Sequence, residues 1–346
     1  MAKRKTQTPS VTPDLMLAEA YRIIDAARAR GVDLRLTGGL AIRHLCTDKG
    51  FLRRSHSDID MVGRQSQTSE LGELFRACGY AENVDVLSAT GGTQRQFYVL
   101  PAIPKRGSRS RGRRGGAIEP TEPSGTIEPA DSSGDTASAD SSRDTGPTDP
   151  ASVAAPHVDV YLDVMRVDHD VWIGDRIDIE DYAISPADLL ISKLQAGRFE
   201  EKDLRDVVAL VKDLPLGDVD AGHQINVGHI ADVCSRDWGL YLDVTTNIDG
   251  VEEDLAPFGL DAEVEQRVVE ALDTIADAIA EEEKTFRWRL RSRLGKRLAW
   301  RREMEQTDGA GLVSVEEAAR QAAEEAAADG GWSGWSGWGG SRRPNE

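Results

Sequence analysis

The chain has 346 residues, of which 39% are hydrophobic, and a formal net charge of −18. This length leaves room for one large domain or two ordinary ones, and the low apolar fraction predicts that part of the chain lies outside the core. The negative charge argues against indiscriminate nucleic-acid binding, although a local basic surface can still contact a nucleic acid.

The three cysteines are scattered and show no metal-ligand spacing, which indicates buried or incidental thiols in a reducing compartment. The first residues lack an apolar leader segment, and no run of eighteen apolar residues occurs. We therefore expect a soluble cytoplasmic protein without a membrane span.

The first two hundred residues alternate between helical and strand periodicity. Residues 1–11 are polar and predict a disordered arm. The expected elements that follow are a helix from 12 to about 31, a strand at 34–37, a helix over 40–47, a strand at 57–62, a helix over 69–78 and a strand at 95–100.

Residues 104–155 interrupt this pattern. They contain mostly Gly, Ser, Thr, Pro, Asp and Glu, with a basic start at Lys105 to Arg114 and an acidic remainder. Because such a segment has few apolar side chains to bury, it predicts a disordered insertion within a folded domain.

Strand periodicity resumes at 157–162 and 170–173, and the sequence then turns helical. Helices are expected from Ser185, over 203–211 and over 264–279, with a weaker alanine-rich helix near 314–328. We predict an α/β (α+β) fold, a small mixed sheet with flanking helices followed by a helical C-terminal region. The predicted divisions are a domain at 12–212, a helical region at 213–304, and a weak helix with a low-complexity tail at 305–346.

Two glycines and three aspartates form the first chemical pattern. Gly38-Gly39 precedes a predicted helix, whose free N–H groups and positive dipole end favour a phosphate. Asp58 and Asp60, two apart on a strand, project to one face, and Asp159 on a later strand supplies a third carboxylate. Such carboxylates repel one another unless a cation lies between them, and oxygen ligands of this kind suit Mg²⁺. Taken singly, a Gly-Gly turn is weak evidence for function, and an Asp-x-Asp pair in a strand is often a solvent-facing edge.

With this order of motifs, the sequence resembles the nucleotidyltransferase superfamily of DNA polymerase β type, and within it the AbiEii-like toxins of bacterial toxin–antitoxin systems. A second stretch is also similar to that family: Asp188 to Gln195, Arg198, Lys202-Asp203 and Asp206. The resemblance implies that Lys193 contacts nucleotide phosphate and that Asp206 organises the site, with Asp203 as the competing choice. Without the family, a lysine beside Leu194 on an amphipathic helix is more often a surface residue whose charged end reaches solvent.

The resemblance implies metal-dependent transfer of an NMP from an NTP to an acceptor hydroxyl. Asp58, Asp60 and Asp159 would bind Mg²⁺, and Gly38 and Gly39 would hold the triphosphate. The implied acceptor is a tRNA 3′ end, with a separately encoded antitoxin as partner. Two alternatives stay open: a small-molecule nucleotidyltransferase of the antibiotic-modifying kind, and an inactive module with this fold that acts by binding.

One further segment is unusual. Lys284 to Arg302 carries nine basic residues with Phe286, Trp288 and Trp300 among them. Basic and aromatic side chains together suit RNA. The recurrence of leucine at 290, 294 and 298 favours instead a packed helix with a solvated basic face.

Overall fold

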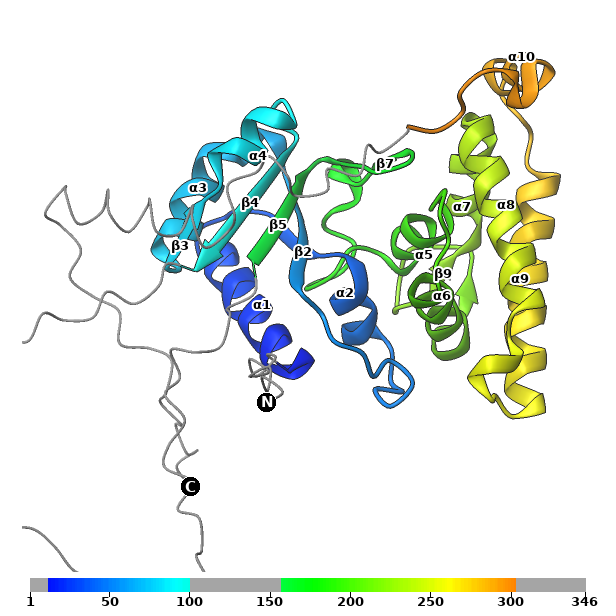
Figure 1. The fold of residues 1–346 in the computed structure, drawn as a ribbon, viewed down its shortest axis with the longest axis horizontal. Helices are drawn as coiled ribbons and strands as arrows, with labels where there is room; N and C mark the ends of the chain where they lie inside the picture. Colours follow the sequence, from blue (N-terminus) through cyan, green and yellow to red (C-terminus); the bar gives the residue numbers. More distant parts are fainter. Residues whose placement is uncertain (1–11, 100–156, 303–346) are drawn as a thin grey trace, which may run out of the picture. The chain divides into compact units, whose positions relative to one another are not determined.

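The computed structural model describes residues 12–99 and 157–302 (Figure 1). The predicted N-terminal arm at 1–11 lies outside this range. So do the predicted insertion at 104–155 and the predicted weak helix and tail at 305–346. None of the described helices is both long and apolar enough to cross a membrane.

A five-stranded mixed sheet forms the centre of the N-terminal half, in the order β1-β2-β5-β4-β3. β2 and β5 run parallel, and the other neighbours are antiparallel. The strands are β1 (Leu34–Leu36), β2 (Asp58–Gly63), β3 (Tyr80–Glu82), β4 (Gln94–Val99) and β5 (His157–Leu162). The pairing of β5 between β2 and β4 brings together segments on either side of the undescribed 100–156 stretch.

Four helices accompany this sheet: α1 (Pro13–Arg28), α2 (Gly38–Leu45), α3 (Thr68–Ala77) and α4 (Val84–Ala89). α1 begins where the sequence predicts, because the Thr12 side chain accepts a hydrogen bond from the Leu15 amide and proline occupies the first turn. The Phe75 ring of α3 stacks on Phe97 of β4 at a centroid distance of 3.9 Å, which fixes α3 to the sheet.

The second half is mainly helical, as predicted. A short hairpin, β6 (Val164–Arg166) and β7 (Asp170–Trp172), leads into α5 (Pro186–Leu194), α6 (Glu201–Asp213), α7 (Val227–Arg236), α8 (Trp238–Glu253), α9 (Ala262–Glu281) and α10 (Phe286–Leu294). A two-residue parallel pair, β8 (Leu216–Gly217) and β9 (Ile225–Asn226), lies between α6 and α7.

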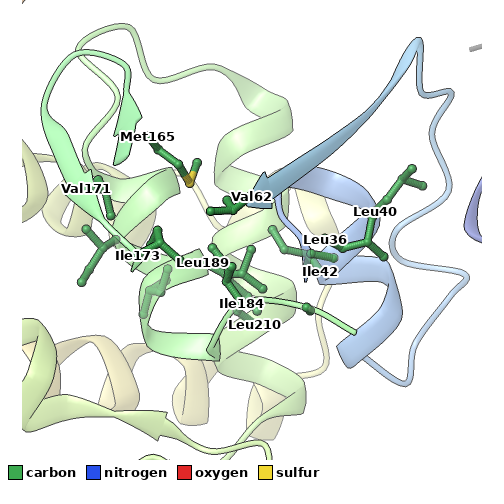
Figure 2. Packing of buried hydrophobic residues seen from close by; sticks show 14 of the residues in the cluster. Leu36, Leu40, Ile42, Val62, Met165, Val171, Ile173, Ile184, Leu189 and Leu210 are labelled. Carbon is green, nitrogen blue, oxygen red and sulfur yellow. The ribbon is translucent and has the colours of Figure 1, made fainter. Parts of the chain in front are cut away.

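One hydrophobic core runs from α1 to α9. Figure 2 shows Leu36, Ile42 and Val62 of the sheet region close to Ile184, Leu189 and Leu210 of the helical region. α2 packs on β2 and also on α5 and α6. The position of α5 and α6 relative to β2 is therefore fixed by packing, and this arrangement carries residues of both halves to one place. The predicted domain boundary near 212 stays a prediction.

Candidate active site

Three adjacent strands align polar side chains at one level of the sheet. Asp60 of β2 is the register partner of Asp159 in β5, and Asp159 is the partner of Gln96 in β4. Two residues earlier, Asp58 pairs with His157. Because partners in register share a face, as do positions two apart, all five side chains lie on the same face of the sheet.

His157 links the carboxylates of the two neighbouring strands. Its Nε2 lies 3.3 Å from Asp159 Oδ2 and 3.9 Å from Asp58 Oδ2, and Gln96 Nε2 donates to Asp159 Oδ1 at 3.1 Å. The hydrogen bond that His157 donates to Asp159 raises the pKa of His157 despite the opposing effect of burial, and the charges of the surrounding carboxylates raise it further. The surplus of negative charge in this cluster favours a cation.

The cluster also has the composition of a metal site. One ligand atom from each of Asp58, His157 and Asp159 lies within 4.8 Å of the others. Carboxylate oxygens suit hard divalent cations such as Mg²⁺, and the imidazole widens the range of metals that the site accepts. The residues present thus fit a divalent cation.

The Asp60 carboxyl is buried beside two other carboxylates. Burial, together with the nearby charges of Asp58 and Asp159, raises the pKa of Asp60 to about 7. Ionised Asp60 is therefore unfavourable in the metal-free fold, and a bound cation would offset this cost.

This pKa shift gives a stability prediction for metal-free protein. The folded chain retains a proton on Asp60 that the unfolded chain releases near pH 4, so stability falls as the pH rises from about 4 to about 7. We expect Asp60→Asn to remove this loss and to stabilise the fold by up to about 4 kcal/mol at pH 8, and by less at pH 5. Urea denaturation in EDTA at both pH values measures the effect, and an equal change at both would contradict it.

The glycine pair lies directly beside the carboxylates. α2 begins at Gly38, two residues earlier than predicted, so both glycines belong to its first turn. Gly38 has a φ of +64°, and a Cβ at this position would collide with the Asp60 carboxylate. The Thr37 side chain does not cap the helix, so it leaves the first-turn N–H groups available for an anion.

A second cluster adjoins this turn. Arg54 Nη2 donates to Asp206 Oδ2 at 2.7 Å, and Lys193 Nζ lies 3.0 Å from the same oxygen and 3.2 Å from Asp203 Oδ1. Asp206 is fully buried, and its Oδ1 has no hydrogen-bond partner among the described residues. A Cβ on Gly39 would collide with the Arg54 guanidinium, so this cationic pair, Arg54 and Lys193, lies at the N-terminus of α2.

The positive charge of Lys193 also affects the nearby carboxylate Asp60. Burial lowers the pKa of Lys193, but Asp206 and Asp203 outweigh it, so the net effect raises the pKa and keeps the ammonium charged. Lys193 in turn acts to lower the pKa of Asp60. Burial, with the positive charges of Arg54, Arg43 and Lys193, lowers the pKa of His56 to about 4, so His56 is neutral at physiological pH.

The structure thus brings together all the residues that the sequence singles out for chemistry: Gly38, Gly39, Asp58, Asp60, Asp159, Lys193 and Asp206. Of the two acidic residues that competed for a supporting role, Asp206 contacts both cations and Asp203 contacts Lys193. Sequence reasoning missed His157 and Arg54. The alternation of the strand holding Asp159 would have placed His157 on the same face, whereas nothing local indicates Arg54.

Comparison with known proteins bears on the chemistry. A model of the aminoglycoside-2''-adenylyltransferase family matches residues 19–95. This range contains Gly38, Gly39, Asp58 and Asp60 and ends before Asp159. No characterised protein and no solved structure matches the chain. The match indicates a nucleotidyltransferase and supports the superfamily inferred from the motifs, but it gives no support to the AbiEii-like family in particular.

Proposed function

We propose that the chain transfers a nucleoside monophosphate from an NTP to a hydroxyl group of a small, positively charged acceptor. The observation that carries this proposal is the meeting of Asp58, Asp60 and Asp159 with the glycine turn of α2 and the cationic pair. The family match favours a small-molecule acceptor. The net charge of −18 adds support, because an acidic protein attracts cationic ligands.

In this proposal Asp58, Asp60 and Asp159 would hold Mg²⁺, with His157 beside them. The bound cation would neutralise charge on the triphosphate and activate the acceptor oxygen. Nucleotide transfer of this kind depends mainly on positioning and charge stabilisation.

The chain's own residues divide the remaining work. The triphosphate oxygens would accept hydrogen bonds from the first-turn N–H groups at Gly38 and Gly39 and from the side chains of Arg54 and Lys193. Asp206 positions these two side chains by its ion pairs with them. The acceptor oxygen bonds to the α-phosphorus while the bond from that phosphorus to the bridging oxygen breaks, so that pyrophosphate leaves. Asp159, fixed by Gln96, takes the proton of the acceptor hydroxyl.

Arg54 provides a test of the phosphate-binding role. We expect Arg54→Ala to raise the KM for the NTP by about 10- to 100-fold, because a charge-assisted contact to phosphate contributes on the order of 1.5–3 kcal/mol. Arg54→Lys should recover part of this loss, since lysine keeps the charge without the fork geometry. Steady-state kinetics measures the effect, with Arg236→Ala, which removes an exposed arginine of α7, as control. Equal KM values for the wild type and Arg54→Ala would contradict the proposed role.

A tRNA 3′ end is the second candidate acceptor, and with it a toxin role opposed by a separate antitoxin. The observation in its favour is the Lys193–Asp203–Asp206 cluster, which lies at the site and belongs to the stretch that resembles the AbiEii-like family. The chain's acidity weighs against a polyanionic acceptor.

Acceptor competition separates the two candidates. Full-length protein with Mg²⁺ and each α-labelled NTP would receive an aminoglycoside mixture, total tRNA, or both. Label on the aminoglycosides alone supports the small-molecule proposal, and label on RNA alone assigns the tRNA reaction. Folded protein that labels neither and binds no NTP would support a binding module with this fold.

A further inference from the structure

An exposed apolar stripe runs along α10 and just beyond it. Phe286, Leu290 and Leu294 are 81%, 53% and 45% exposed, and Leu298 is 53% exposed. Positions four apart lie on one face of a helix, so the first three form a continuous stripe. Half of the large exposed apolar residues of the described chain lie in these thirteen positions, and such a concentration marks an interaction surface.

The opposite side of α10 fixes the helix to the protein body. Trp288 packs edge-to-face on Tyr241 of α8 at a centroid distance of 5.2 Å. The Thr285 amide donates to the Ser235 carbonyl at 3.1 Å, and Lys284 donates to carbonyls at the end of α9. Since Trp288 lies about 200° around the helix from Phe286, anchoring through Trp288 directs the stripe away from the body. The prediction of a packed helix at the leucine positions is therefore wrong.

Arginines flank the stripe on both sides. The segment 284–302 contains no acidic residue. Arg287 and Arg293, like Arg297 further on, are exposed and make no ion pair or hydrogen bond with any described residue. An apolar ridge on α10 with one unpaired arginine on each side, Arg287 and Arg293, complements a helix whose apolar stripe is flanked by carboxylates.

We propose that this stripe binds an acidic amphipathic helix of a partner protein. Nucleic acid fits less well, because two of the three aromatic rings in 284–302 are engaged with the protein and only Phe286 is exposed for base stacking. Trp288 packs on Tyr241, and Trp300 Nε1 donates to Asp243 at 3.2 Å. A phosphate backbone would also leave the leucines in water.

An anionic membrane fits less well for a different reason. α10 directly follows the exposed residues Glu281, Glu282 and Glu283, and α9 exposes Asp273 and Asp277. An extended anionic surface would lie against these carboxylates and be repelled, whereas a single helix seated on the stripe can avoid them.

The test uses full-length protein and a fluorescent synthetic peptide with leucine at heptad a and d positions and glutamate at e and g. The matched peptide has lysine in place of glutamate. Fluorescence anisotropy would be recorded for wild type, Leu290→Ser/Leu294→Ser, Arg287→Glu/Arg293→Glu, and Val219→Ser, which changes an exposed valine elsewhere. Labelled single-stranded RNA and phosphatidylglycerol vesicles are tested in parallel, and thermal unfolding checks each fold.

The expected result is binding of the glutamate peptide only, weakened at least about tenfold by either double variant and unchanged by Val219→Ser. If the glutamate peptide bound Leu290→Ser/Leu294→Ser as tightly as the wild type, binding would depend on charge alone and the proposal would be wrong. Binding of RNA or vesicles without the peptide would overturn it as well. Self-association of the wild type that the leucine variant abolishes would assign the stripe to a second copy of the chain instead.

Discussion

Replacing Asp58 by asparagine is expected to reduce nucleotidyl transfer by at least about 1,000-fold, comparable with removing a principal electrostatic group from an active site. Asp58 lies within the cluster formed with His157 and Asp159, and asparagine keeps its shape while removing the charge that attracts a cation. The side chain is partly exposed, so the fold should tolerate the change. Label transfer at saturating NTP and Mg²⁺ measures the loss.

Asp277→Asn serves as the control, because it removes a carboxylate from the exposed face of α9. It should retain the activity of the wild type. If Asp58→Asn kept more than a tenth of the activity, the assignment of Asp58 as a metal-binding carboxylate would be wrong.

Asp206→Ala is expected to lower the free energy of unfolding by about 3 kcal/mol, because removing one member of a buried ion pair leaves its partners unpaired. Asp206 is fully buried and bonded to both Arg54 and Lys193. The variant leaves Lys193 with Asp203 alone and leaves Arg54 without this carboxylate. Urea denaturation without nucleotide gives the value.

Asp249→Ala is a suitable comparison, since it removes an exposed aspartate from α8 and should change stability by less than about 0.5 kcal/mol. A similarly small change for Asp206→Ala would show that the Arg54–Asp206–Lys193 cluster contributes little to the stability of the fold. The proposed role of Asp206 in positioning Arg54 and Lys193 would then be wrong too.

Much of the fold follows from local patterns. The alternation over 57–62 and 157–162 corresponds to β2 and β5, and the apolar spacing around Leu189 and Val268 corresponds to α5 and α9. These segments carry strong periodicity because each buries one face. The three-residue strand β3 and the short helix α4 were missed, because such brief elements depend on pairing with distant residues rather than on their own pattern.

The helices α7 and α8 were not predicted individually, although they lie within the region 213–304 that was expected to be helical. α8 places Trp238, Tyr241, two glycines and two threonines among its apolar residues, which obscures a single apolar face. Its position is set by packing against α5, α7 and α9. Tertiary contacts of this kind outweigh local propensity and cannot be read from one segment.

The site residues that belong to short sequence motifs could be predicted, whereas those brought in from distant parts of the chain could not. Asp58 and Asp60 form a short motif on one strand, and Gly38 requires a conformation that glycine adopts readily. Arg54 lies 152 positions from Asp206, and only the packing of α2 on α5 and α6 brings them together. A contact over such a separation leaves no spacing for sequence reasoning to detect.

The most direct test of the central claim is nucleotide transfer by full-length protein with and without Mg²⁺, beside an Asp58→Ala/Asp60→Ala variant. Each α-labelled NTP would be offered with mixed aminoglycosides and total tRNA, and pyrophosphate release would be followed together with label on the acceptor. Mg²⁺-dependent label transfer by the wild type and none by the variant is the expected result. Transfer that persists in the folded double variant would contradict the assignment of these carboxylates as the catalytic centre.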